Sequence, residues 1–185
     1  MMEEQELAEQ CRRGDNNARQ QLYEQYAAHL YGMCLRYVSD RDTAQDLLHD
    51  GFLLIFRSME KFQWRGKGSL GAWMDRVMVN LALQYLRREA ATDRVDYLEQ
   101  LPDVPDEPDS TLAEEVPAEV VMELVKRLPV GFRTVFNLYV VEGKSHKEIA
   151  EMLGIREKSS ASQLARAKEA LAQGIRRWLE QKEKF

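Results

Sequence analysis

Short polar and cationic side chains recur at helical spacing near the C-terminus. On a helix over residues 156–181, at about 100° per residue, they share one side. This polar side carries Lys158, Ser159, Ser162 and Arg166, with Gln163 at its boundary. The apolar side carries Ser160, Leu164, Ala167, Leu171, Ile175 and Trp178. Hydroxyls, amides and cations can read base edges and phosphates, so the pattern predicts a helix for a DNA major groove. A helical bundle with a solvated polar face is the alternative interpretation.

The residues just before this helix predict the element that positions it. Ser145 and Glu148 have the spacing of a capping box, which starts a helix at Ser145. A short apolar stripe follows, and Gly154 then allows the chain to turn. The stretch from Ser145 to Ile155 therefore reads as the first helix and turn of a helix-turn-helix.

A second group of aromatic and cationic side chains lies in the loop 63–68. Trp64 stands beside Arg65 and Lys67, on a backbone made flexible by Gly66 and Gly68. A base can stack on an indole ring while cations hold phosphates, so this loop suits single-stranded nucleic acid. The alternative is that Trp64 folds back onto the core.

The next predicted helix, from Ser69 to about Glu89, also has two faces. Its apolar face carries Leu70, Met74, Val77, Met78, Leu81 and Tyr85. Its other face carries Ser69, Trp73, Arg76, Asn80 and Arg87. An indole beside cations and an amide predicts a surface that holds an opened A·T-rich duplex, where stacking offsets part of the unstacking cost.

Two earlier helices are indicated by their starts. Asp15 precedes a helix to about Val38, and Ser39-Asp40 precedes a second helix to about Phe62. The second helix has a core stripe of Ala44, Leu47, Leu48, Gly51, Phe52, Ile55, Met59 and Phe62. Its exposed positions include Asp46, His49, Asp50 and Arg57, which form either a solvated face or a docking surface for a protein.

Charge divides the chain into three segments. Residues 96–123 hold ten Asp and Glu and no Lys or Arg, whereas residues 124–185 hold 13 Lys and Arg against seven Asp and Glu. Four of the five prolines also lie in the acidic middle, where they prevent a long helix. We expect an all-α protein with two helical domains, 1–94 and 118–185, joined by an acidic Pro-rich linker at 95–117. The basic C-terminal part can bind phosphates although the net charge is −5.

Several classes of function are not expected. Cys11 and Cys34 have no ligand spacing, so we expect inert thiols and no metal site. There is no nucleophile elbow, phosphate-binding glycine loop or convergent acid-base set, so we expect no enzyme, no cofactor and no small-molecule substrate. No membrane-spanning stretch or signal-peptide pattern is evident, which predicts a cytoplasmic protein.

The order of these motifs resembles bacterial RNA polymerase sigma factors of the extracytoplasmic-function (ECF) group. Residues 42–52, DTAQDLLHDGF, are similar to the segment that docks on the beta-prime clamp. Residues 61–88 are similar to the melting and minus-ten segment, with Lys61-Phe62, Leu70 to Met74, Arg76-Val77, Asn80 to Ala82 and Tyr85 to Arg88. Leu128-Pro129, Arg133 to Phe136, Glu142-Gly143 and Ser145 to Ile155 are similar to the minus-thirty-five reader. Arg156 stands at the helix N-cap, where the family commonly has Ser or Thr. Ser159, Ser160, Ala161 and Gln163 stand where many members have Thr, Val, Lys and Arg, which lowers the local positive charge.

The resemblance implies a transcription initiation factor with three binding surfaces. Core polymerase, through its beta-prime clamp and beta flap, is the expected protein partner, with Asp46, Leu47, His49, Asp50 and Phe52 at the interface. The melted minus-ten strand is assigned to Trp64, Arg65, Lys67, Ser69, Trp73, Arg76, Asn80 and Arg87. The minus-thirty-five duplex is assigned to Lys158, Ser159, Ser162, Gln163 and Arg166. Many ECF relatives also have an anti-sigma partner.

Two other hypotheses fit the residues. A stand-alone helix-turn-helix regulator would form a dimer and bind an operator tightly without polymerase. A protein-binding adaptor would never touch DNA and would tolerate Arg76→Ala and Arg87→Ala in any transcription assay.

Overall fold

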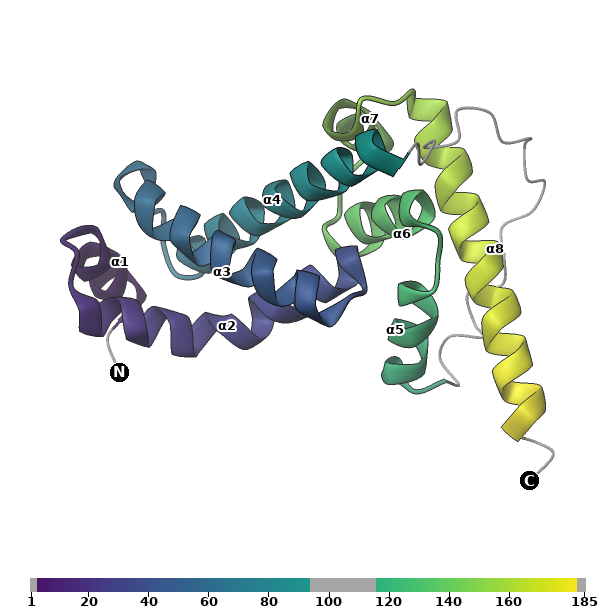
Figure 1. Ribbon diagram of the computed structural model, residues 1–185, viewed down its shortest axis with the longest axis horizontal. Helices are drawn as coiled ribbons and strands as arrows, with labels where there is room; N and C mark the ends of the chain where they lie inside the picture. Colours follow the sequence, from purple (N-terminus) through teal and green to yellow (C-terminus); the bar gives the residue numbers. More distant parts are fainter. Residues whose placement is uncertain (1–2, 94–115, 183–185) are drawn as a thin grey trace. The chain divides into compact units, whose positions relative to one another are not determined.

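The computed structural model describes residues 3–93 and 116–182, and within these ranges every regular element is helical (Figure 1). The chain divides into two compact units, Met1–Arg88 and Glu89–Phe185. The first contains α1 (Glu4–Arg12), α2 (Asn16–Val38), α3 (Arg41–Ser58), the 3-10 turn η1 (Met59–Lys61) and most of α4 (Ser69–Asp93). The second contains α5 (Ala118–Lys126), α6 (Val130–Phe136), the π-helical turn η3 (Asn137–Val141), α7 (His146–Leu153) and α8 (Glu157–Lys182). The predicted all-helical fold is confirmed.

The helix starts expected in the first unit are present. Asp15 accepts the Ala18 N–H at 2.7 Å and so caps α2, and Asp40 accepts the Thr43 N–H at 2.7 Å and caps α3. Hydrogen bonds from Thr43 lower the pKa of the Asp40 carboxyl. The α-helix expected to reach Phe62 ends at Ser58 and tightens into η1.

Apolar burial along α3 and α4 builds the first core. All eight positions of the expected α3 stripe are buried, as are Leu70, Met74 and Met78 of α4. Gly51 leaves room for the Met78 side chain of α4, because a Cβ atom there would lie 2.1 Å from Met78 Sδ and the thioether would have to move. Helix α1 has no counterpart in the sequence-based prediction. It buries Leu7, Ala8 and Cys11 against this unit.

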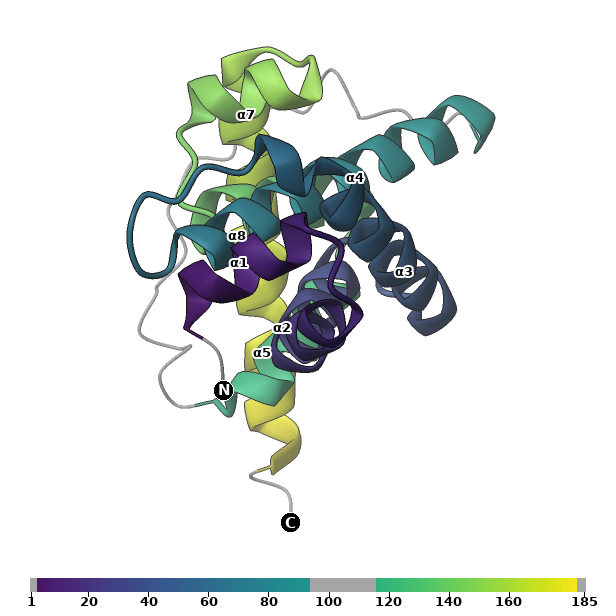
Figure 2. The same ribbon diagram turned by 90° about the vertical axis from the view of Figure 1, so that its left-hand side faces the viewer.

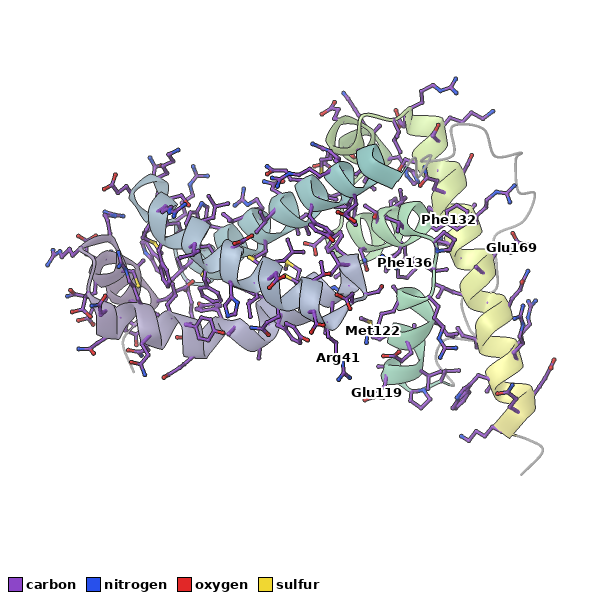
Figure 3. The ribbon with its side chains drawn as sticks, viewed as in Figure 1. Arg41, Glu119, Met122, Phe132, Phe136 and Glu169 are labelled. Carbon is purple, nitrogen blue, oxygen red and sulfur yellow. The ribbon has the colours of Figure 1, made fainter. Side chains whose placement is uncertain are left out.

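The second unit packs its shorter helices on α8. Its core joins Val125 and Leu128 to Ala167 and Leu171, and partly buried side chains surround it. These partly buried side chains are Val121, Leu124, Phe132 and Phe136, of which the two phenylalanines of α6 are labelled in Figure 3. The apolar side expected for α8 is buried from Ser160 to Ile175. Trp178 is half-buried, and Lys182 Nζ lies over its indole ring, 5.2 Å from the ring centroid. α8 is thus the packing platform of this unit.

The expected acidic linker falls almost entirely on residues 94–115, which lie outside the described residues. Within the described ranges, no helix has the length and apolar character needed to cross a membrane.

Candidate nucleic-acid interfaces

A groove of about 720 Å³ lies where the 63–68 loop meets α4. It is lined by Lys61, Phe62, Gln63, Arg65, Ser69, Ala72, Trp73, Arg76, Val77 and Asn80. Five residues predicted to bind a single strand therefore come together: Arg65, Ser69, Trp73, Arg76 and Asn80. We call this the strand groove.

The strand groove combines an aromatic wall with exposed polar groups. Trp73 is half-buried, and its ring centroid lies 5.3 Å from that of Phe62 with the planes tilted by 46°. Arg76 and Asn80 are exposed one helical turn apart on α4, and Arg76 Nε donates to the Ala72 carbonyl at 3.4 Å. The groove can therefore offer a stacking surface, a cation and an amide to one unpaired base.

Three other residues predicted for the same role do not line this groove. Trp64 is half-buried in a second groove of about 550 Å³ that is formed with α1. Lys67 and Arg87 are exposed, Lys67 in the loop and Arg87 far along α4. Trp64 thus folds back toward the protein, as the alternative interpretation of the loop proposed.

Helix α1 holds the loop at both ends. Arg12 Nη2 donates to the Phe62 carbonyl at 3.2 Å, before the loop. After the loop, the Glu4 carboxylate accepts the N–H groups of Gly68 at 2.6 Å and Leu70 at 2.9 Å. Figure 2 shows α1 beside the chain that enters α4. Sequence reasoning missed these contacts because α1 itself was not predicted.

The outward face of α3 differs from the one expected. Asp46, His49 and Asp50 are exposed, as predicted for a docking surface. Leu47 and Phe52, however, are only 5% and 3% exposed, so the prediction that they form the surface is wrong. Both belong to the core stripe, and the Phe52 ring packs on Tyr23 at 4.7 Å between centroids. The exposed apolar residues of α3 are instead Leu53 and Leu54, at 54% and 42%.

The helix-turn-helix has the predicted local geometry. Ser145 and Glu148 form a complete capping box: Glu148 N–H donates to Ser145 Oγ at 3.3 Å and Ser145 N–H donates to Glu148 Oε2 at 2.8 Å. The Glu148 carboxylate accepts this bond from the Ser145 N–H and a second one from Ser145 Oγ at 2.8 Å, and the two bonds lower the pKa of the carboxyl. Gly154 ends α7 at φ 69°, which permits the sharp turn into α8.

His146 joins α7 to α8. Its Nδ1 lies 3.0 Å from Ser160 Oγ, and its ring stacks on Tyr139 with centroids 4.7 Å apart. Burial lowers the pKa of His146, so the neutral imidazole is favoured at this contact.

Four of the five residues predicted on the polar face of α8 are accessible. Lys158 is exposed, and Ser159, Ser162 and Arg166 are half-buried. Gln163 is only 2% exposed, so its expected place at the edge of the polar face is wrong. A boundary residue can turn to either side, and here neighbouring helices cover it.

Two family models match the two units. "Sigma-70 region 2" matches residues 22–92 and "Sigma-70, region 4" matches residues 118–171, which together are more than half of the chain. The chain belongs to the sigma-70 family. This sigma factor is 27% identical to the RNA polymerase sigma-H factor of Pseudomonas aeruginosa, over 94% of each chain. It is also 27% identical to the ECF RNA polymerase sigma-E factor of Haemophilus influenzae, over 93% of this chain and 95% of the relative.

A solved structure agrees in fold. The sigma factor RpoE of Bartonella quintana, determined in complex with the anti-sigma factor NepR, matches with a TM-score of 0.51 and 16% identity. The match covers 85% of this chain and 96% of that one. This match concerns the fold alone, and the family models with the sequence relatives confirm the expected ECF sigma factor with two helical domains.

The family assignment decides between the functional hypotheses. Sigma factors are transcription initiation factors that work with core RNA polymerase and promoter DNA, and they are not enzymes. This assignment replaces the hypotheses of a stand-alone regulator and of an adaptor.

The two cysteines are buried. Burial raises the pKa of the Cys11 thiol to about 11 and that of the Cys34 thiol to about 12, so both thiols stay protonated at neutral pH.

Proposed function

We propose that this sigma factor reads the minus-ten element of its promoters as a melted strand in the strand groove. The observation that carries the proposal is the convergence of Arg65, Trp73, Arg76 and Asn80 from two segments on one groove. An unpaired base can stack on an indole ring at about 1–3 kcal/mol per base, while guanidinium groups contact the flanking phosphates. A base within a duplex is already stacked, so the groove favours the opened strand.

The minus-thirty-five element is assigned to the polar face of α8. Lys158, Ser159, Ser162 and Arg166 supply the accessible groups, and α7 holds α8 through the His146–Ser160 contact. Gln163 is removed from the direct contacts because its side chain is buried. Its neighbours on the polar face lie near the start of α8, the part of a recognition helix that contacts base edges.

Core polymerase is assigned to the outward face of α3. The positions Asp46, His49, Asp50, Leu53 and Leu54 recur at three and four along that helix, so they share one face. Exposed leucines beside acidic side chains suit a protein interface, whose centre is apolar and whose rim is charged. In this proposal Leu47 and Phe52 act only by supporting the helix from within.

The remaining roles follow the same division of the chain. Residues 1–94 bind core and the minus-ten strand, residues 118–185 bind the minus-thirty-five duplex and the beta flap, and residues 95–117 connect them. The protein works in the cytoplasm, where polymerase is found. An anti-sigma protein that covers these faces would hold it inactive, as NepR accompanies the RpoE of Bartonella quintana.

Reconstitution with purified core polymerase tests the proposal. The chain is expected to co-elute with core and to start transcription at a subset of promoters, which sequencing of the transcripts would identify. Replacing Leu53 and Leu54 together by Glu should abolish co-elution, because two charges would be placed at an apolar contact. Ala28→Glu, an exposed apolar position on α2, is the control for added charge. Normal co-elution of the double variant would overturn the α3 assignment.

A further inference from the structure

A glycine stands at the start of α4, where a capping side chain is usually found. The Ala72 N–H donates to the Gly68 carbonyl at 3.1 Å, which makes Gly68 the N-cap residue. Gly68 has φ 83°, a conformation that favours glycine, and it has no side chain to accept the orphan N–H groups of the first turn. Another residue must supply that acceptor.

Glu4 supplies it from 64 residues earlier in the chain. Its two carboxylate oxygens accept three N–H groups: Gly68 at 2.6 Å, Leu70 at 2.9 Å and Gly71 at 3.4 Å. Leu70 and Gly71 occupy the second and third positions of the helix. An N-cap side chain normally accepts a hydrogen bond from the backbone N–H group at one of these positions. A carboxylate is also the charge that the positive end of a helix favours.

The neighbouring side chain that could have capped α4 is used elsewhere. Ser69 Oγ accepts the Arg65 N–H at 3.2 Å, and this bond closes the loop on itself. The Ser69 N–H donates to the Gly66 carbonyl at 3.1 Å. The loop that carries Arg65 into the strand groove is therefore tied at its end to both Ser69 and Glu4.

Helix α1 is itself firmly held, so it can act as a fixed support. Leu7 is fully buried, and Ala8 and Cys11 are almost so. At the far end of α1, Arg12 holds the Phe62 carbonyl and also pairs with Glu9, at 3.0 Å. One short helix thus fixes the chain both before and after the loop.

From this arrangement we infer that Glu4 is a positioning residue for minus-ten recognition: its carboxylate sets the loop and the first turn of α4 in the conformation that reads the base. This inference rests on the proposed function of the strand groove. A strand with the correct base needs the ordered loop, and without Glu4 the loop must be ordered during binding. A strand with a wrong base is held mainly by the guanidinium of Arg76, which lies beyond the first turn of α4 and does not need the ordered loop. Loss of Glu4 therefore lowers selectivity.

The test compares Glu4→Gln with Glu6→Gln in the assembled holoenzyme. Glu6 is exposed on the same helix and makes none of the three hydrogen bonds that Glu4 makes to the start of α4, so its replacement removes the same charge and leaves those bonds in place. Gln at position 4 keeps one acceptor oxygen and loses the other. The probe is the labelled non-template strand of a promoter that the holoenzyme transcribes, and the same strand with single bases changed in the minus-ten element. Fluorescence anisotropy gives the ratio of the two affinities.

We expect Glu4→Gln to lower this ratio about fivefold, the change that corresponds to the loss of one capping interaction, and Glu6→Gln to leave it unchanged. General destabilisation would reduce the active fraction for both strands equally and would not move the ratio. Binding of core and of the upstream duplex should stay as in the wild type. Hydrogen exchange at Gly68, Leu70 and Gly71 should become faster in Glu4→Gln alone.

Two results would overturn the inference, and they are distinguishable. If the wild type is selective and Glu4→Gln is equally selective, Glu4 does not position the loop, while the proposed function stands. If the wild type shows no selectivity for the strand, the proposed function fails and the role of Glu4 fails with it. Glu4→Asp keeps the charge on a shorter side chain and carries the test if Glu4→Gln does not assemble with core.

Discussion

The helices α4 and α7 begin in opposite ways. α7 is capped by its own neighbours, Ser145 and Glu148, which exchange hydrogen bonds across three residues. α4 begins at a glycine, and its first N–H groups are taken by Glu4 on α1. The helix-turn-helix is therefore specified locally, whereas the loop of the strand groove depends on the folded first unit around it. In the proposed function, tertiary structure thus holds in place the loop that meets the melted strand.

The largest predicted effect separates the two proposed DNA-binding surfaces. Trp73→Ala should weaken binding of the minus-ten single strand by roughly ten- to a hundredfold, because a stacked base contributes about 1–3 kcal/mol. Replacing Ser162 and Arg166 together by Ala should weaken preference for the upstream duplex by a similar factor, since base-edge contacts have similar energies. Both affinities are measured for each variant by anisotropy with the holoenzyme. Trp73→Phe, which keeps an aromatic ring, is the control.

If either variant lost affinity equally for the single strand and for the duplex, the assignment of the two DNA elements to two separate surfaces would be contradicted. An unchanged promoter profile after replacement of Ser162 and Arg166 would refute the assigned face of α8.

A moderate effect tests the local cap. Ser145→Ala should lower the free energy of unfolding of the second unit by about 1 kcal/mol, which is typical for loss of a Ser N-cap. Hydrogen exchange along α8 reports on this unit, and hydrogen exchange along α2 reports on the first. Ser162→Ala makes the same chemical change away from the cap and should cost less. A comparable loss of protection along α2 would show that the helix-turn-helix is not locally specified.

The smallest predicted effect is the pH dependence of the second unit. Burial lowers the folded-state pKa of His146 from 6.5, so below pH 6.5 the unfolded chain binds a proton before the folded chain does. The free energy of unfolding should be independent of this group above that pH, and should fall as the pH drops toward the lowered pKa. Trp178 fluorescence in urea at about pH 7.5 and about pH 5.5 measures it, in a chain whose two other tryptophans, Trp64 and Trp73, are replaced by Phe.

His146→Gln should remove this pH dependence. The two other histidines, His29 and His49, lie in the first unit, so they do not obscure the result. A second unit that is equally stable at both pH values would contradict the role of His146 burial.

Local patterns were sufficient to predict much of this molecule. Asp15, Asp40 and Ser145 each mark a helix start that the structure confirms, and the α3 stripe is buried at every predicted position. These features depend on residues within one or two helical turns of each other. Ser69, Trp73, Arg76 and Asn80 were also expected on one face, because α4 is long and its two faces are chemically distinct, and they line the strand groove.

The errors occurred where a property depends on distant parts of the chain. Leu47 and Phe52 were assigned to the surface through family resemblance, although their spacing had already placed them in the core stripe. Gln163 sits at a boundary that only neighbouring helices can resolve. The roles of Glu4 and Trp64 require α1 to be in place, and nothing within a few residues of either signals a contact about 60 positions away.

Phe62 has a consequence for any mutational map of the first unit. Its ring is 4% exposed and faces Trp73, and the residue lines both the strand groove and the second groove, which contains Trp64. The two hollows therefore share a single partition. A substitution at Phe62 changes the shape of both grooves at once. A ligand that displaces the Phe62 ring from one groove also changes the shape of the other groove.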